Sequence, residues 1–192
     1  MKPGIKRTSA AFITLLLLFG FAGVGRTQAA EFSADMALTS KEGGRMNDIK
    51  IYVKNNRMRQ EFSEGAGRQV SISRPDKNLV WFVMPDEKMY MESDLSTDKN
   101  SMKEWKVENE QKAKFVGKET VNGFACKKYE VKEGGDTVTT WISEELNYPI
   151  KSKGKDWEFE LKNIKKGGVA DSLFEVPAGY RKMEIPTMPQ QQ

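Results

Sequence analysis

The chain has 192 residues, with 31 Lys and Arg against 27 Asp and Glu, which gives a net charge of +4 at neutral pH. It contains no histidine, so catalytic sites built on a histidine base and metal sites built on imidazole are excluded. A single cysteine excludes an intramolecular disulfide and a cysteine-cluster zinc site. The length fits one domain, and 38% hydrophobic residues are enough for a folded core.

The first 29 residues have the pattern of a secretory signal peptide. Three bases near the start precede a mostly apolar run over residues 10–24, and small residues close the segment at Ala29 and Ala30. The apolar run is shorter than the ~20 residues that a membrane-spanning helix needs, which favours cleavage over retention as an anchor. We therefore expect cleavage after Ala29 or Ala30 and a periplasmic protein.

Removal of residues 1–29 changes what the charge implies. That segment holds four bases and no acid, so the remaining chain has 27 bases and 27 acids and is electrically balanced. A balanced chain offers no electrostatic attraction to a phosphate backbone, and we expect no nucleic-acid partner.

Most of the remaining chain alternates apolar and polar residues with a period of two, which predicts half-buried β-strands. Turn residues separate these segments, and Asn122-Gly123 is the strongest hairpin signal among them. Residues 79–84 are apolar on both parities, so we expect that strand to be covered on both faces. The predicted strands lie at 32–38, 49–54, 57–62, 70–73, 79–84, 89–91, 114–121, 124–132, 137–143 and 157–161.

Two segments break the alternation. Residues 98–112 are polar and follow several possible N-caps, which predicts one helix with Met102 and Trp105 on the same face. Residues 144–148 predict a turn or short helical piece that ends at Pro149. The sequence therefore predicts a mainly β domain (α+β in a minor part) over residues 30–185. Its architecture is a single curved antiparallel sheet with one or a few helices packed against the concave side. Residues 186–192 are expected to form a disordered tail.

The polar residues do not single out a catalytic site. Acids alternate with lysines, as on solvated strand faces, and no pair of carboxylates stands out for glycosidic chemistry. No serine lies in a Gly-x-Ser-x-Gly elbow, although a Ser-Lys dyad stays open. We expect no enzyme activity, no catalytic residues, no cofactor and no metal.

Two further features allow two interpretations each. Cys126, followed by two lysines, is either a reactive thiol or a small side chain packed in the sheet, and the missing second cysteine favours packing. The lysines of the late strands either attract an anionic headgroup or an acidic partner, or protect a solvated edge strand from aggregation. These lysines are Lys151, Lys153, Lys155, Lys162, Lys165 and Lys166.

The apolar residues are more informative about function. Methionine is flexible and polarizable, so a sheet face rich in methionines adapts to ligands of variable shape. Large aromatic side chains lie on the same predicted strands, and each buried CH₂ of an acyl chain would contribute ~0.8 kcal/mol. The alternative is ordinary filling of the core beneath the helix. The predicted lining of an apolar cavity is Met36, Ile51, Met58, Phe62, Trp81, Met89, Met91, Trp105 and Phe159.

The carboxy-terminal third resembles the LolA/LolB-like superfamily. The resemblance rests on Thr140–Ser143, Tyr148–Ile150, Phe159–Leu161 with Ile164, and above all on Asp171–Tyr180 with its Phe-x-Val-Pro-x-Gly-Tyr ending. Over residues 31–139 it is diffuse and rests on strand order and on the Asn-Gly-Phe-x-Cys-x-Lys-Tyr stretch at 122–129.

This superfamily includes periplasmic lipoprotein carriers, lipid-binding mycobacterial lipoproteins and a periplasmic sensor that regulates the envelope-stress sigma factor. The chain is most similar to a branch of small exported bacterial proteins of unassigned function. The resemblance implies an incomplete antiparallel barrel, closed by helices, with an apolar cavity that accepts acyl chains. It assigns no binding residue, and the cavity-closing arginine of the carriers has no counterpart in the matched stretches.

Three hypotheses on function follow. The first is a periplasmic protein that binds a lipid, or an acyl chain of a lipoprotein, in the cavity. The second is a protein-interaction or envelope-stress sensor module of the same fold without lipid. The third, less favoured, is a hydrolase. The expected partners are a lipid or an acylated protein, with peripheral membrane contact, and the protein is expected to be a monomer.

Overall fold

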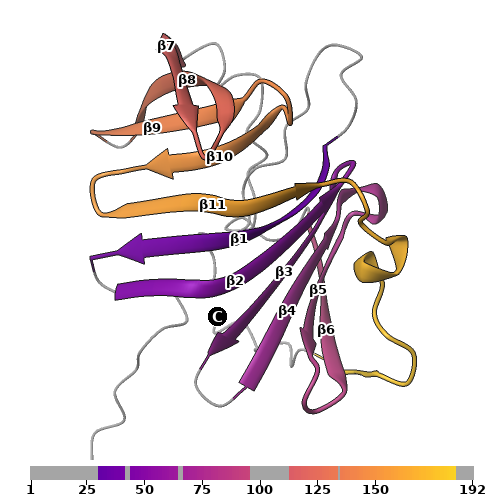
Figure 1. Cartoon of the computed structure of the whole chain (residues 1–192). Helices are drawn as coiled ribbons and strands as arrows, with labels where there is room; N and C mark the ends of the chain where they lie inside the picture. The colour runs from indigo at the N-terminus through magenta and orange to yellow at the C-terminus, as the bar shows by residue number, and fades with distance from the viewer. Residues whose placement is uncertain (1–29, 42–43, 65–66, 96–112, 134, 185–192) are drawn as a thin grey trace, which may run out of the picture.

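One continuous antiparallel sheet forms the fold (Figure 1). The computed structural model describes residues 30–41, 44–64, 67–95, 113–133 and 135–184. Within these residues twelve strands pair in the order β12-β6-β5-β4-β3-β2-β1-β11-β10-β9-β8-β7. The neighbours are antiparallel except for β12, which runs parallel to β6. This confirms the predicted single curved antiparallel sheet.

Short turns connect most consecutive strands, as the sequence predicted. Asn122 and Gly123 have φ values of 49° and 84°, the left-handed conformation that a tight hairpin turn requires. Asn55 and Asn78 are also left-handed, and both lie in predicted turns. The strands are β1 (Glu31–Ser40), β2 (Gly44–Lys54), β3 (Arg57–Glu64), β4 (Gly67–Arg74), β5 (Leu79–Met84), β6 (Met89–Asp94), β7 (Lys114–Val121), β8 (Phe124–Glu133), β9 (Asp136–Ser143), β10 (Tyr148–Lys153), β11 (Trp157–Lys166) and β12 (Arg181–Lys182), with 3₁₀ helices η2 (Pro75–Lys77) and η3 (Asp171–Phe174).

Strand β10 was not predicted from the sequence. The sequence interpretation placed a turn or helical piece at 144–148 and no strand directly after it. Residues 144–147 form a turn, and Tyr148 and Pro149 already belong to the sheet. Pro149 has no N–H for the ladder, and the register between β10 and β9 shifts between Pro149 and Lys151. The proline is therefore tolerated at an irregularity of the sheet.

The sheet is strongly coiled, because side chains from non-adjacent strands meet across it. Tyr148 on β10 and Met58 on β3 are four strand positions apart, which is ~19 Å in a flat sheet. Nevertheless the Tyr148 hydroxyl donates to the Met58 sulfur at 3.5 Å. The face that carries both side chains is the concave face, and the opposite face is convex.

A large apolar cluster fills the concave face between β1, β2, β3, β10 and β11. The alternation in β1 is visible in its burial, since every second side chain from Phe32 to Leu38 is buried. Fully buried members include Phe32, Ile51, Ile150 and Leu161. This cluster is the main core of the protein.

The convex face of β4 and β5 is covered by residues 169–183, which we call the strap. A second buried cluster joins Val70, Ile72, Trp81 and Val83 of the sheet to Val169 and Phe174 of the strap. Phe174, in η3, has no exposed surface. The strap then adds β12 to the edge of β6 (Figure 1). The sequence predicted that the strand at residues 79–84 is covered on both faces, and the strap covers its convex face.

Ion pairs attach the strap to bases of the sheet. Asp171 accepts hydrogen bonds from Lys54 and Arg57, and Glu175 accepts hydrogen bonds from Arg74 and Lys77. The Arg57 guanidinium also lies 4.8 Å from the centre of the Phe174 ring. The second cluster is therefore bordered by charge-assisted bonds on two sides.

Helices contribute little to the described structure. The helix predicted at 98–112 lies outside the described residues, as do the predicted signal peptide and the tail 186–192. Among the described residues the helical segments are short 3₁₀ turns, and η3 contacts β3 and β4 on the convex side, not the concave side. No helix within these residues is long and apolar enough to cross a membrane.

Phe174→Ala should lower the free energy of unfolding by about 3–5 kcal/mol, because the variant leaves a cavity between the strap and the sheet. Urea unfolding, followed by tryptophan fluorescence, measures this loss. The matched control is Phe115→Ala at a side chain that is 52% exposed, where we expect less than about 1 kcal/mol. Equal losses in the two variants would contradict the assigned role of Phe174.

Stability should fall in acid because the strap depends on ionised carboxylates. Hydrogen bonds from Arg57 and Lys54 hold the pKa of Asp171 below its usual 3.8. Burial opposes ionisation of Glu175, but hydrogen bonds from Arg74 and Lys77 outweigh it and lower its pKa below 4.5. With depressed native pKa values, the stabilisation is complete well above these ordinary values and is lost as the pH falls through the native ones.

Double substitution of the two acids (Asp171→Asn with Glu175→Gln) tests this dependence. At pH 7 the variant should be less stable than the wild type in urea unfolding, and the difference should shrink towards pH 3. A difference that stays constant over this range would show that the two carboxylates do not cause the acid sensitivity of the strap.

Candidate functional site

The concave face of β3–β6 carries the side chains that best fit a binding surface. Cross-strand neighbours share a face in an antiparallel sheet, so the register defines which residues belong to it. One row runs directly across the sheet through Ile51, Gln60, Ser71, Phe82 and Met91. Ile51 belongs to the main core, so the whole row lies on the concave face.

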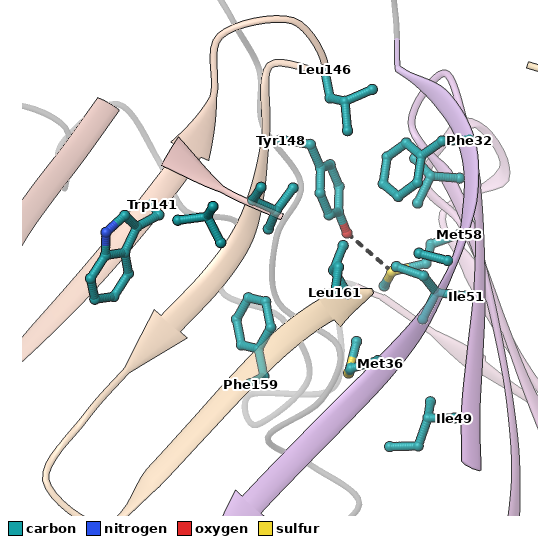
Figure 2. Close-up of a cluster of buried hydrophobic side chains, with 14 of the residues drawn as sticks. Phe32, Met36, Ile49, Ile51, Met58, Trp141, Leu146, Tyr148, Phe159 and Leu161 are labelled. Carbon is teal, nitrogen blue, oxygen red and sulfur yellow. Dashed lines mark hydrogen bonds between the residues drawn. The ribbon is translucent and has the colours of Figure 1, made fainter. Parts of the chain in front are cut away.

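One part of the concave face is filled by its own side chains (Figure 2). The Tyr148 ring packs edge-to-face on Phe32, with centroids 5.1 Å apart, and its hydroxyl reaches Met58. Burial raises the pKa of Tyr148 well above its usual value, so the hydroxyl stays a neutral donor. Leu146 and Leu161 close the same region. Between β10 and β3, therefore, side chains occupy the hollow of the sheet.

The part of the concave face over β3, β5 and β6 is different. Five of its apolar side chains are only half-buried, although they occupy the same face as the core residues, whereas Val80 of β5 on this face is buried. They come from the predicted methionine-rich strands and from two aromatic positions. We call this surface the methionine-rich face, and its members are Phe62, Phe82, Met84, Met89 and Met91.

Polar side chains lie beside this surface on β3 and β4. Gln60, Ser71 and Ser73 are each at most 3% exposed. The Ser71 hydroxyl makes no hydrogen bond to any residue that the structure describes. A buried hydroxyl without a partner is unfavourable by roughly 1–3 kcal/mol. The interior of this half of the sheet is therefore not optimised as a dry core.

The structure places the predicted cavity residues in three groups. Met36, Ile51, Met58 and Phe159 lie in the main core on the concave face, and Phe62 packs against it. Met89 and Met91 belong to the methionine-rich face, as does Phe62, which lies where that face meets the core.

Trp81 lies on the convex face beneath the strap, where its indole N–H donates to Glu92 at 2.8 Å. Trp105 lies outside the described residues.

Three residues that contribute to the concave face are missing from the predicted lining of the cavity. Phe82 and Met84 lie in the strand that is apolar on both parities, where alternation cannot assign a face. Tyr148 lies beside a proline that indicated the end of an element. The adjoining segments give no local signal that Tyr148 reaches Met58, 90 residues away.

Cys126 is a packed side chain. It has no exposed surface, and its thiol lies 3.4 Å from the carbonyl oxygen of Phe124. Burial raises the pKa of the Cys126 thiol, so the lysines that follow it do not activate it. The packed interpretation of this cysteine fits the structure.

The lysines of the late strands are largely paired. Lys151 lies 3.2 Å from Glu158, and Lys162 lies 3.7 Å from Glu160. Lys166 pairs with Glu145. These ion pairs offset most of the basic charge of the late strands within the described residues. The described residues contain no cluster of acids and cysteine able to hold a metal ion.

Solved structures show what the fold is similar to. An uncharacterized conserved protein from Thermus thermophilus is 11% identical with a TM-score of 0.57, and the match covers 81% of this chain and 90% of that one. A chain of the Pseudomonas aeruginosa MucA/MucB complex is 14% identical with a TM-score of 0.56, over 79% of this chain and 57% of that one.

PNGF-II is 13% identical with a TM-score of 0.51, and the match covers 82% of this chain but only 31% of PNGF-II. This chain thus spans about a third of PNGF-II and just over half of the matched chain of the MucA/MucB complex. At these identities the likeness concerns the fold alone.

The sequence comparison is more specific. No curated protein matches the chain. Residues 32–149 match the family described as "Domain of unknown function (DUF4412)". Because this match covers more than half of the chain, the protein belongs to the DUF4412 family.

Proposed function

We propose that this protein is an exported binding protein that holds the acyl chain of a lipid or lipoprotein against the methionine-rich face. The observation that carries the proposal is that Phe62, Phe82, Met84, Met89 and Met91 are half-buried on the same face whose other part is a buried core. Apolar surface of this kind gains free energy when a ligand removes it from water.

An acyl chain fits the chemistry of this surface better than a rigid ligand does. Methionine side chains are unbranched and adjust to chains of different length and curvature. Gln60 and the two serines border the face, and the Ser71 hydroxyl is without a hydrogen bond among the described residues. Convergent polar groups beside an apolar surface are usual in small-molecule sites. The resemblance to lipid-binding relatives points in the same direction.

The predicted signal peptide supports a periplasmic location, and it is part of the proposal. We place the folded domain at residues 30–185. The proposal assigns no catalytic group, since Cys126 is buried with a raised thiol pKa and Ser71 has no base within hydrogen-bond distance in the described structure.

A protein-interaction module without lipid is the second candidate. It is favoured by the likeness to a chain of the MucA/MucB complex and by apolar surface on the sheet edge. Phe115 and Val116 of the edge strand β7 are 52% and 38% exposed. An edge strand with exposed apolar residues pairs readily with an extended peptide. In this case the purified protein would carry no lipid.

The test combines ligand extraction with a binding assay on the purified, processed chain. Mass spectrometry of an organic extract should detect acyl chains or phospholipid. The uncharged methyl ester of dansyl-labelled undecanoic acid should bind with enhanced fluorescence. Phe82→Ala should weaken this binding roughly tenfold, because the variant removes a large apolar contact from the methionine-rich face.

Phe115→Ala is the matched control, since it makes the same substitution at the far edge of the sheet and should leave the ester affinity unchanged. Circular dichroism and thermal unfolding check that Phe82→Ala folds, and Met84→Ala replaces it if it does not. Absence of lipid from the extract together with absence of ester binding would refute the proposal and leave the interaction module.

A further inference from the structure

A guanidinium lies at the rim of the methionine-rich face. Two successive residues of the strap, Arg181 and Lys182, pair with β6 and point to opposite faces of the sheet. Lys182 turns to the convex face, where it binds Glu92 at 2.7 Å. Arg181 turns to the concave face, where its Nη2 donates to the sulfur of Met89 at 3.3 Å.

Arg181 differs from the ion-paired arginines of this half of the sheet. Arg57, Arg59 and Arg74 each pair with a carboxylate on the convex face. Arg68 of β4 forms no ion pair among the described residues, but it lies on the convex face. Among the described residues no carboxylate lies within ion-pair distance of Arg181, and its side-chain partner is a thioether. A thioether is a weak acceptor, whereas a guanidinium has five N–H donors. Arg181 therefore keeps donors available for an anion.

The acidic residues around Arg181 either bind other groups or form no ion pair with Arg181. Asp86 accepts a hydrogen bond from the Arg68 backbone N–H at 2.9 Å. Glu92 is bound by Lys182 and Trp81 on the convex face. Glu87 and Glu184 are exposed and form no ion pair with Arg181 in the described structure. The Arg181 guanidinium thus lies beside apolar side chains without a carboxylate partner among the described residues, and the exposed Lys88 lies next to it in the chain pairing.

The geometry also fixes which apolar groups the cation adjoins. Met84, Met89 and Arg181 are direct neighbours in a cross-strand row, and Met91 follows two residues along β6. An apolar chain that lies over Met84, Met89 and Met91 would therefore end next to the guanidinium. A planar carboxylate matches the two parallel N–H groups of a guanidinium.

We propose that the ligand of the methionine-rich face is a long-chain carboxylic acid, with its chain on the methionines and its carboxylate bound by Arg181. This inference rests on the proposed function and specifies it further, because it selects an anionic single-chain amphiphile over an uncharged acyl group. The backbone supports the position, since the Arg181 N–H donates to the Lys88 carbonyl oxygen at 2.9 Å.

The test compares two probes that differ only in charge: dansyl-labelled undecanoic acid and its methyl ester. The wild-type chain should bind the acid about fivefold more tightly than the ester, as expected for one partly exposed ion pair. Arg181→Gln should abolish this preference while the ester affinity stays unchanged. Arg181→Lys should keep part of it, because the charge remains and the planar fork is lost. Added salt should reduce the preference in the wild type.

Arg68→Gln is the matched control, an exposed arginine on the convex face of β4, and it should behave as the wild type. Equal loss of acid and ester binding in Arg181→Gln would overturn the inference, as would tighter binding of a lysophosphatidate than of the fatty acid. If the wild type binds ester and acid equally, the inference fails and the proposed function stands. If it binds neither, the proposed function fails.

Discussion

The contact between Tyr148 and Met58 across the concave face is the constraint on which the rest of the structure depends. It joins β10 to β3, four positions away in the sheet, and it can form only if the sheet coils until these strands face each other. Phe32 holds the tyrosine ring from the side. The buried hydroxyl then uses a sulfur as its acceptor, which is a weak bond, so the packing of the ring and not the hydrogen bond must contribute most of the stabilisation. This coil divides the concave face into a part filled by Tyr148 and a part over β3–β6 that Tyr148 does not reach.

The coil also explains why the strap is needed. Val70, Ile72 and Val83 point to the convex face, where a curved sheet has no opposing sheet to pack against. Phe174 covers them, and the acids of the strap bind Arg57 and Arg74 at the border of the cluster. Hydrogen bonding to Asp76 raises the pKa of Arg74, so this nearly buried guanidinium stays charged and keeps its carboxylate partners. By covering the convex face, the strap leaves the concave face as the surface where a ligand can be held. The same strap brings Arg181 to the rim of that surface, so stability and the proposed recognition share one segment.

The sequence predicts the strands well because each strand is indicated by its own residues. It predicts the site less well because the site depends on contacts between residues far apart in the chain. Alternation from Phe32 to Leu38 and the Asn122-Gly123 turn define their elements without reference to the rest of the chain. Trp81 shows the limit. Its strand is apolar on both parities, so only the pairing with Ile72 reveals that Trp81 points to the strap. Phe82, the next residue, points to the opposite side and belongs to the methionine-rich face. Arg181 shows the same limit, because two residues of strand give no periodicity, and its face follows only from its partner Met89.

Polar residues of β3 and β4 interrupt the apolar concave face. In the row Ile51, Gln60, Ser71, Phe82 and Met91, two adjacent polar residues on β3 and β4 interrupt the apolar ones, and a core of this kind does not require them. A valine in place of Ser71 would remove an unsatisfied hydroxyl from a position that is only 3% exposed. If stability alone governed this face, the serine would be an unexplained defect. On a flat sheet Ser71 lies roughly 16 Å from Arg181, too far for both to bind the same carboxylate. The hydroxyl therefore does not define the charged end of the ligand, and its most direct effect is to limit how tightly β3 and β4 pack into a dry core beside the methionines.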